Sequence, residues 1–373
     1  VIPCLVDRGI NLEDARDYGI VGCVEPQCSG KTDGWYDAAF FNLAKVLEMT
    51  INNGKEIGPK TGEFESFKTF DEFIEAYKKQ MKYFVGQMVS ADNSVDLAHR
   101  ERAPLPFVSC MLDDCIAKGK SIQEGGAHYR SSGPLGVGIA NVGDSFMAIK
   151  KLVFEENKIT LADLKAAIDS DFGNKEDDEI KKNKYKKIKQ ILLNRSPKFG
   201  NDIDEVDELT RLGALIYCKE VEKYTNQRGG KFLPGLYPVS NNVHLGDQVG
   251  ATPDGRNASE PIADGVSPTR GLDTHGPTAA ANSVAKLDHF IAASGTLFNQ
   301  KFTPTSLAGD NGLRNLASLV RSYFEEKGMH VQFNVVNKQI LIDAQKHPEQ
   351  YRDLVVRVAG YSAQSVSYTH LRA

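Results

Sequence analysis

The sequence predicts an α/β fold made mainly of helices, with shorter strands and long glycine-rich connections. Amphipathic helical segments recur along its 373 residues, and strand-like segments alternate with them in the C-terminal part. That alternation is typical of parallel βα units. With 41% hydrophobic and 25% charged residues the chain can bury a large core, and its length allows one or two domains.

Hydrophobic periodicity predicts helices in several segments. The first spans residues 38–52 and ends at Gly54, with its apolar side chains mostly on one side. The other candidates span residues 70–88, 161–168, 205–224 and 312–324. Strand signals lie at residues 235–239, 330–336 and 354–358. The last of these strands would deliver Gly360 to a loop.

A glycine-rich run at residues 133–143 suggests a nucleotide-binding loop. The surrounding sequence lacks the strand-then-helix frame and the third glycine spacing that such loops need. We therefore expect a tight loop packed against the rest of the fold, followed by a helix capped at Asp144 or Ser145. Phosphate binding is not expected here.

Charge and hydropathy argue against several kinds of partner. A net charge of −4 and a pI near 6.1 give no reason to expect nucleic acid. The basic stretch at residues 181–187 follows an acidic run at 176–179, and we interpret it as a solvated helix. The sequence has no apolar run long enough to cross a bilayer, and charged residues interrupt its opening segment, so we expect neither a membrane partner nor a signal peptide. These features predict a cytoplasmic protein.

The six cysteines are few for this length, as expected of reduced cytosolic thiols. Their spacings match no common zinc pattern, so no metal is expected. Cys23 and Cys28 could form a disulfide by spacing alone. Cys110 and Cys115 lie in a predicted helix and are interpreted as packing residues.

Two short segments near opposite ends carry more information. Residues 22–26 read Gly-Cys-Val-Glu-Pro, and residues 357–363 read Arg-Val-Ala-Gly-Tyr-Ser-Ala. Taken alone, the first is usually a buried thiol beside a solvated carboxylate, and the second a strand that ends at a turn glycine. Together, in this order and with the glycine close to the C-terminus, they resemble the two radical-bearing loops of the glycyl radical enzymes.

The chemistry explains the residue types. A glycine Cα radical is delocalised into the amides on both sides, and the missing side chain lets another residue approach closely, so Gly360 would store the radical. Cys23 has a weak S–H bond and could become a thiyl that abstracts hydrogen from a substrate C–H bond. Glu25 lies two residues on, and in an extended segment it would share a side with Cys23, where it could move a proton.

Further motifs extend the resemblance over nearly the whole chain. Residues 30–42 look like the stretch that follows the cysteine in glycerol and 1,2-propanediol dehydratases and in choline trimethylamine-lyase, although Tyr36 stands where those diol dehydratases carry histidine. Residues 250–256 and 263–268 resemble motifs shared more widely, the first even with pyruvate formate-lyase. That enzyme has two adjacent cysteines where this chain has Cys23-Val24-Glu25. The single cysteine therefore argues for a lyase or dehydratase.

The resemblance implies a fold as well. Family members form a ten-stranded α/β barrel, in which finger loops carrying the cysteine and the glycine meet inside. This chain would be the C-terminal part of such a barrel. Residues 1–245 would belong to the barrel and carry the Cys23 loop, and residues 246–373 would form the glycyl radical domain with the Gly360 loop. The region ahead of the cysteine loop is absent, the tail after about residue 365 looks truncated or foreign, and the chain is expected to be inactive by itself.

The implied activity is cleavage of a C–O or C–N bond in a small alcohol such as glycerol, 1,2-propanediol or choline, giving an aldehyde under anaerobic conditions. A radical S-adenosylmethionine activating enzyme is the expected partner, a homodimer is left open, and the only cofactor would be the post-translational radical at Gly360. Catalysis would fall to Cys23, Glu25 and Gly360. Asp37 would contact substrate or protonate the leaving group, or would be only the N-terminal residue of a helix. Arg357 is expected to support the glycine loop.

Other functions remain open from the sequence. Within the same class, arylacetate decarboxylation, hydroxyproline dehydration, isethionate cleavage and a formate acetyltransferase-like reaction are alternatives. A noncatalytic replacement for a damaged radical domain would need the glycine but neither Cys23 nor Glu25. Ordinary nucleophilic catalysis by a Cys23 thiolate with a histidine base would require a low thiol pKa and would leave Gly360 unexplained.

Overall fold

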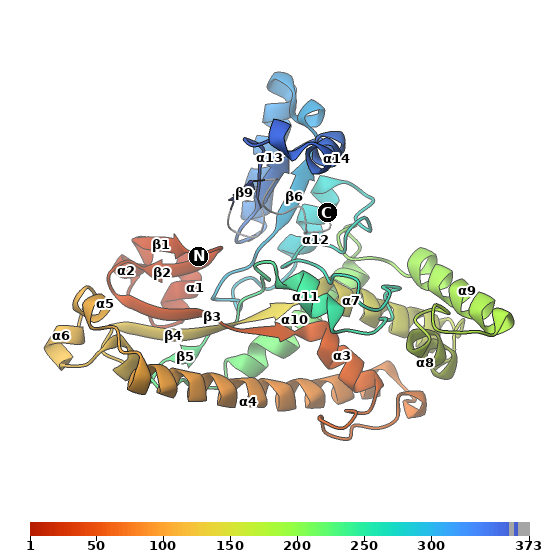
Figure 1. The fold of residues 1–373 in the computed structure, drawn as a ribbon, viewed down its shortest axis with the longest axis horizontal. Coiled ribbons are helices and arrows are strands. Elements are labelled where there is room, and N and C mark those ends of the chain that lie inside the picture. Colours follow the sequence, from red (N-terminus) through yellow and green to blue (C-terminus); the bar gives the residue numbers. More distant parts are fainter. Residues whose placement is uncertain (358–361, 365–373) are drawn as a thin grey trace.

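The computed structural model describes residues 1–357 and 362–364, the last three by their backbone alone, and its fold is α/β (Figure 1). A parallel sheet in the order β3-β4-β5 runs through the body, where β3 spans Thr32–Asn42, β4 Tyr129–Val137 and β5 Lys231–Phe232. Parallel bridges from Leu135 to Gly235 and from Leu236 to Thr296 continue it toward the C-terminal strands. This succession of parallel strands agrees with the predicted fold class, although the described residues do not form a closed barrel.

The other elements follow the chain order. The helices are α1 (Ile2–Asp7), α2 (Leu12–Arg16), α3 (Leu43–Ile51), α4 (Phe70–Arg102), α5 (Pro106–Cys110), α6 (Cys115–Lys118), α7 (Ile139–Ala148), α8 (Leu161–Asp169), α9 (Glu179–Arg195), α10 (Asp204–Val221), α11 (Asn241–Asp247), α12 (Pro277–Ala285), α13 (Gly309–Glu325) and α14 (Lys338–Lys346). The remaining strands are β1 (Tyr18–Val21), β2 (Glu25–Cys28), β6 (Asn299–Phe302), β7 (Gln332–Val335), β8 (Val355–Arg357) and β9 (Ser362–Gln364).

The hydrophobic core lies where α4, α7 and α10 pack against one another beside the sheet. The long helix α4 runs along one side of the body (Figure 1), and the Thr69 side chain caps its start by accepting a hydrogen bond from the Glu72 N–H. Tyr77 and Phe146 are fully buried and meet edge to face, with ring centroids 5.1 Å apart. A π-helical stretch, Ile149–Glu155, continues α7. This core supports the sheet beside which it lies.

The predicted helix at residues 38–52 begins later than expected. Residues up to Asn42 belong to β3, and only Leu43–Ile51 are helical. The reason is long-range pairing, because Phe40, Phe41 and Asn42 pair with the last residues of β4. The Asn42 side chain then accepts a hydrogen bond from the Lys45 N–H and so caps α3.

The glycine-rich run is also different from the prediction. Its first residues lie in β4, and α7 begins directly after Gly138, whose φ is +93°. The expected loop and the expected cap at Asp144 or Ser145 are therefore wrong. A β-carbon at Gly136 would lie 2.7 Å from the Tyr217 ring, so this glycine permits close packing of α10 on the central strand.

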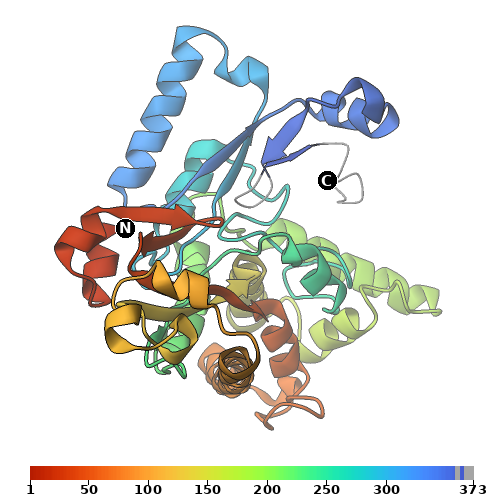
Figure 2. The same cartoon turned by 60° about the vertical axis from the view of Figure 1, so that its left-hand side comes forward.

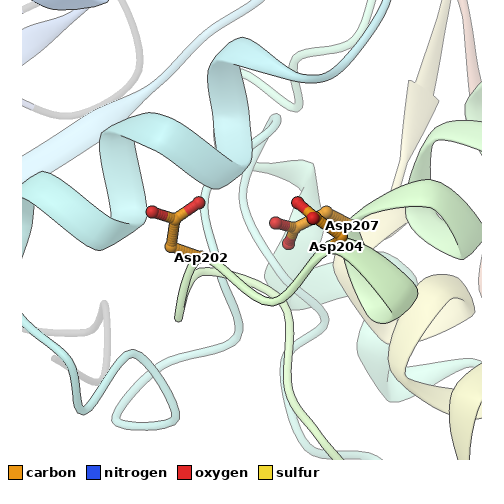
Figure 3. Close-up of side chains that lie close together, drawn as sticks. All are labelled: Asp202, Asp204 and Asp207. Atoms are coloured by element: carbon orange, nitrogen blue, oxygen red, sulfur yellow. The ribbon is translucent and has the colours of Figure 1, made fainter.

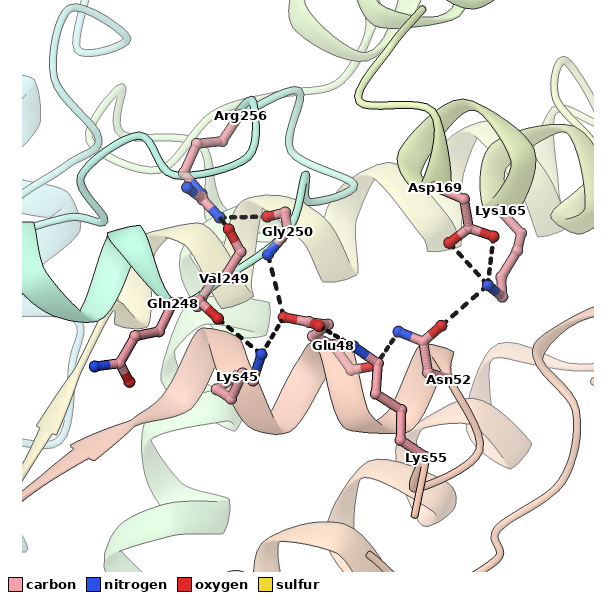
Figure 4. Close-up of polar contacts among 10 residues, drawn as sticks. All are labelled: Lys45, Glu48, Asn52, Lys55, Lys165, Asp169, Gln248, Val249, Gly250 and Arg256. Carbon is pink, nitrogen blue, oxygen red and sulfur yellow. Dashed lines mark hydrogen bonds and ion pairs between the residues drawn. The ribbon is translucent and has the colours of Figure 1, made fainter. Parts of the chain in front are cut away.

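The motif at residues 250–256 clamps helix α3 to the body (Figure 4). The Arg256 guanidinium donates to the carbonyls of Val249 and Gly250, which folds the motif back on itself. The buried Glu48 carboxylate accepts from the Gly250 N–H at 3.2 Å and pairs with Lys45 and Lys55. The motif therefore has a structural role in this chain.

Several predicted elements are present with shifted ends. The segments at 161–168, 205–224 and 312–324 correspond to α8, α10 and α13, and the segment at 70–88 is the first part of α4. Residues 330–336 contain β7, whereas residues 235–239 make bridges without a regular strand. Figures 1 and 2 show β6, β7, α13 and α14 together on one side of the body, away from α4. In the described part of the chain, the helices are all too short or too polar to span a membrane.

Candidate active site

Cys23 lies at the tip of a β-hairpin. Strands β1 and β2 pair antiparallel with Val21 opposite Glu25, and Gly22, Cys23 and Val24 form the turn between them. Gly22 has a φ of +62°, a left-handed conformation that favours glycine. The expectation of one extended segment from Cys23 to Glu25 is therefore wrong for Cys23, which the turn presents at the hairpin end.

The Glu25 carboxylate folds back onto this turn. It is 2% exposed, and it accepts a hydrogen bond from the Val24 N–H. Burial raises its pKa above the usual range for a glutamate, and the hydrogen bond from Val24 opposes that rise. A buried carboxylate with a raised pKa beside a reactive thiol is well suited to accept a proton.

The Cys23 thiol keeps its hydrogen at neutral pH. Burial, together with the nearby charges of Glu25 and Asp37, raises the pKa of Cys23 to about 12. A thiolate nucleophile needs the opposite shift, so the reading of Cys23 as an ordinary nucleophile loses its physical basis. A thiol that stays protonated is the state from which a hydrogen atom can be given away.

Asp37 lies in β3 and not at the start of a helix. The register between β3 and β4 shifts between Tyr36 and Phe40, and Asp37 sits in this irregularity with a φ of +57°. Such bulges bend a strand and turn a side chain toward a site. The Asp37 side chain is exposed, but partial desolvation still raises the pKa of its carboxyl group. The Tyr237 side chain opposes part of that rise. The alternative of a helix N-terminal residue is wrong.

Tyr237 joins the two carboxylates and was missed by the sequence analysis. Its buried hydroxyl lies close enough to both Glu25 and Asp37 to lower the pKa of each, while burial raises its own pKa. Among the described residues, its hydroxyl has no hydrogen-bond partner of regular geometry. The strand signal at residues 235–239 placed Tyr237 in an extended stretch, but nothing local tied it to residues 25 and 37.

Other residues support the hairpin that carries Cys23. The Tyr36 hydroxyl donates a 2.9 Å hydrogen bond to the Pro26 carbonyl, next to Glu25. A β-carbon at Gly295 would lie 2.5 Å from the Val24 carbonyl oxygen, so Gly295 lets its segment close on the turn. Tyr36 therefore helps to position the hairpin that carries Cys23.

Gly360 lies outside the described residues. Arg357, the last residue of β8, lies three residues before it in the sequence. The Arg357 charge partly offsets the rise in the Cys23 pKa. The structure thus brings together Cys23, Glu25 and Asp37.

In the part of the chain that the structure describes, one carboxylate group has metal-like spacing. Asp202, Asp204 and Asp207 gather at the start of α10 (Figure 3). The Lys286 ammonium lies 2.7 Å from Asp202, 2.7 Å from Asp204 and 2.9 Å from Asp207. Lys286 already supplies the positive charge that a metal ion would bring, so we assign this group a structural role.

Family models match most of the chain. A model described as pyruvate formate lyase-like matches residues 1–246, and one described as glycine radical matches residues 262–366. The second range includes Gly360. The first range includes the hairpin, the bulge and Tyr237, which together make the candidate site.

Solved structures that are similar to this chain agree with the family models. A B12-independent glycerol dehydratase from Clostridium butyricum, solved with glycerol bound, is 64% identical and superposes with a TM-score of 0.94 over 98% of this chain and 46% of its own. A structure from Roseburia inulinivorans, described for 1,2-propanediol dehydration, is 55% identical with a TM-score of 0.96 over 99% of this chain and 48% of its own.

A curated relative from Clostridioides difficile, trans-4-hydroxy-L-proline dehydratase, is 39% identical over 97% of this chain and 45% of its own length. The chain thus spans about half the length of the relatives it matches. The relatives include dehydratases and lyases. The ranges that the two family models match contain Cys23 and Gly360. The chain belongs to the pyruvate formate lyase-like family of glycyl radical enzymes.

Proposed function

We propose that this chain is the C-terminal part of a glycyl radical dehydratase or lyase acting on a small alcohol, with residues 1–245 in the barrel and residues 246–373 as the radical domain. The observation that carries the proposal is the hairpin that presents Cys23 at its tip, with the buried Glu25 carboxylate folded back onto the same turn. The whole enzyme would hold a ten-stranded barrel of which this chain supplies part. Its shared length with the relatives, about half, supports that view.

The proposed reaction begins outside the site. An activating enzyme that uses S-adenosylmethionine removes a hydrogen atom from Gly360, and this radical takes the hydrogen atom of the Cys23 thiol. The thiyl then abstracts hydrogen from the hydroxyl-bearing carbon of the substrate. Glu25 accepts the proton of that hydroxyl, a role that its raised pKa favours.

The second half of the reaction breaks the bond. The substrate radical expels the neighbouring group, and for a diol Asp37 gives the departing hydroxyl a proton, so that water leaves. Cys23 returns a hydrogen atom to the remaining radical, which gives the aldehyde product and leaves the thiyl again. A proton passes from Glu25 to Asp37, which restores both carboxyl groups and closes the cycle. The Tyr237 side chain opposes the rise that burial causes in the pKa of both carboxyl groups.

The substrate is proposed from similarity. The 64% identity to the glycerol dehydratase and the 55% identity to the propanediol structure favour a vicinal diol. Choline remains an alternative because residues 30–42 also resemble choline trimethylamine-lyase. Hydroxyproline and isethionate are acted on by relatives of 39% and 33% identity, which makes them weaker candidates.

The test is anaerobic electron paramagnetic resonance on the whole protein after treatment with its activating enzyme. We expect a glycine-type doublet that disappears in Gly360→Ala. Cys23→Ser should keep the doublet but lose turnover of 1,2-propanediol, glycerol and choline. Cys110→Ser, which changes an exposed cysteine outside the site, is the control and should behave as wild type. Absence of a radical under conditions that activate a related enzyme would refute the proposal.

A further inference from the structure

One hydrogen bond joins the two segments that carry the proposed acid and the proposed base. Tyr36 lies in β3 directly before Asp37, and its hydroxyl donates a 2.9 Å hydrogen bond to the carbonyl of Pro26. Pro26 is buried in β2 and directly follows Glu25. The residue next to one carboxylate is therefore bonded to the residue next to the other.

This bond matters because backbone pairing does not fix the hairpin against the main sheet. Within the described chain, β2 and β3 belong to different sheets. They are joined at the foot of the hairpin, where β2 ends and the Cys28 N–H donates to the Thr32 hydroxyl at 3.1 Å. Tyr36 lies four residues beyond Thr32, about 13 Å along an extended strand. A bond that far from the foot resists a rotation of the hairpin that the bonds at the foot alone would allow.

The Tyr36 ring is itself held in a narrow slot between glycines. A β-carbon at Gly34 would overlap Cε2 of the ring, and one at Gly133 would lie 3.0 Å from Cδ1. Gly133 is the β4 residue that pairs with Tyr36. The ring therefore lies close over the backbone of both strands, and the direction of its hydroxyl is fixed. Apolar packing of Val24 also holds the hairpin, but such contacts set no direction.

We propose that Tyr36 is a positioning residue, which fixes the separation of Glu25 and Asp37 so that the two groups reach neighbouring carbons of one vicinal diol. This inference rests on the proposed function, in which one carboxyl group accepts a proton from the substrate and the other supplies one to the departing hydroxyl. The Tyr36 hydroxyl is engaged by Pro26, so its effect comes through the two segments that it joins. A misplacement of about 1 Å can cost about 10²-fold in rate.

Two pairs of variants separate this role from general stability. Tyr36→Phe keeps the ring in its slot and removes only the hydroxyl. Its control is Tyr18→Phe, the same change at an exposed residue of β1 in the same hairpin. Gly34→Ala keeps the hydroxyl but displaces the ring. Its control is Gly19→Ala in β1, where a β-carbon would meet no atom of the described chain within 4 Å apart from its sequence neighbours.

The experiment measures turnover of 1,2-propanediol and glycerol by the whole protein after anaerobic activation, with the radical counted and the melting temperature recorded for each variant. We expect Tyr36→Phe and Gly34→Ala to lower kcat per spin about tenfold or more, with the spin yield and KM within about twofold of wild type. Both controls should match wild type. A role in stability alone would lower the melting temperature but leave kcat per spin unchanged. If Tyr36→Phe does not fold, the comparison of Gly34→Ala with Gly19→Ala decides.

The outcomes separate this inference from the proposed function. A wild-type protein that forms no radical, or whose radical turns over neither diol, would overturn both. Wild-type turnover with equal kcat per spin in Tyr36→Phe and Tyr18→Phe would overturn the positioning role alone. A loss in Tyr36→Phe that appears only in KM would also overturn it, because Tyr36 would then act on substrate binding. Loss of folding in both Tyr36→Phe and Gly34→Ala would do the same, since the bond would then be needed for the fold itself.

Discussion

The Cα of Gly22 lies against the carboxylate of Glu25, so close that a β-carbon at residue 22 would stand 2.6 Å from Oε1. Glu25 and the turn that presents Cys23 are therefore built as one unit. The glycine meets two demands at once, since its φ is +62° and its neighbour leaves no room for a side chain. This relationship gives the first prediction.

Gly22→Ala should abolish most turnover of the activated whole protein. The new methyl group must displace the Glu25 carboxylate or the turn, and either shift moves Cys23 away from its partners. Gly30→Ala is the matched control, because Gly30 has a similar φ of +69° with no atom within 4 Å of its β-carbon position. Both variants should lose about 1 kcal/mol of stability from the left-handed backbone, measured by denaturant unfolding. Equal turnover in the two variants would contradict the prediction.

Alkylation of Cys23 should be slow and should still be rising with pH above pH 9. A thiol with a pKa near 12 is ionised only to about one part in 10⁴ at pH 8, and the thiolate is the reactive form. Glu25→Gln removes a negative charge beside the thiol, which lowers the Cys23 pKa and increases the rate severalfold. Mass spectrometry after iodoacetamide treatment follows each cysteine, and the exposed Cys110 serves as the internal reference. A plateau for Cys23 near pH 7 would contradict the expectation.

The stability of the chain should depend on the ionisation of Asp92 in α4. Burial, aided by the nearby Asp96, raises the pKa of Asp92 to about 7, and its Oδ2 has no hydrogen-bond partner in the part of the chain that the structure describes. The folded state keeps a proton that the unfolded state releases between about pH 4 and pH 7, so the free energy of unfolding falls as pH rises through this window. The effect is at most about 4 kcal/mol.

Asp92→Asn should therefore raise the melting temperature relative to wild type at pH 8 and have little effect at pH 4. Differential scanning calorimetry at the two pH values makes the comparison. Asp71→Asn changes an exposed residue at the start of the same helix and should show only a small difference at either pH. A benefit of Asp92→Asn that is the same at pH 4 and pH 8 would mean that ionisation of Asp92 is not the cause.

Lys286 should be needed to neutralise the aspartates at the start of α10. Lys286→Ala leaves Asp207, which is 0% exposed, with an unpaired charge, and breaking a buried pair in this way typically costs about 3 kcal/mol. Chelators should leave the wild-type melting temperature unchanged, whereas millimolar Ca²⁺ should restore part of the loss in Lys286→Ala. Lys184→Ala, which breaks an ion pair with the more exposed Asp163, is the control and should cost well under 1 kcal/mol. A wild-type protein that melts earlier with chelator would show that a metal, and not Lys286 alone, holds the cluster.

The sequence alone determined the family and the helices with strong periodicity. The order of the Cys23 and Gly360 motifs indicated the family, because each motif is local and its residue types follow from radical chemistry. Helices α8 and α10 were predicted close to their observed ends, since both bury one face against the same core. Local patterns were sufficient to predict an element or a motif where the residues of one segment alone identify it.

Tertiary structure decided the rest of the candidate site. Residues 38–42 are compatible with helix or strand, and their pairing with β4, almost a hundred residues away, makes them a strand and places Asp37 in a bulge. Tyr237 reaches Glu25 only because the segment after β5 bridges to Leu135 and packs on Val24. Hydrophobic periodicity indicates which face of a segment is buried. It does not indicate which distant segment covers that face.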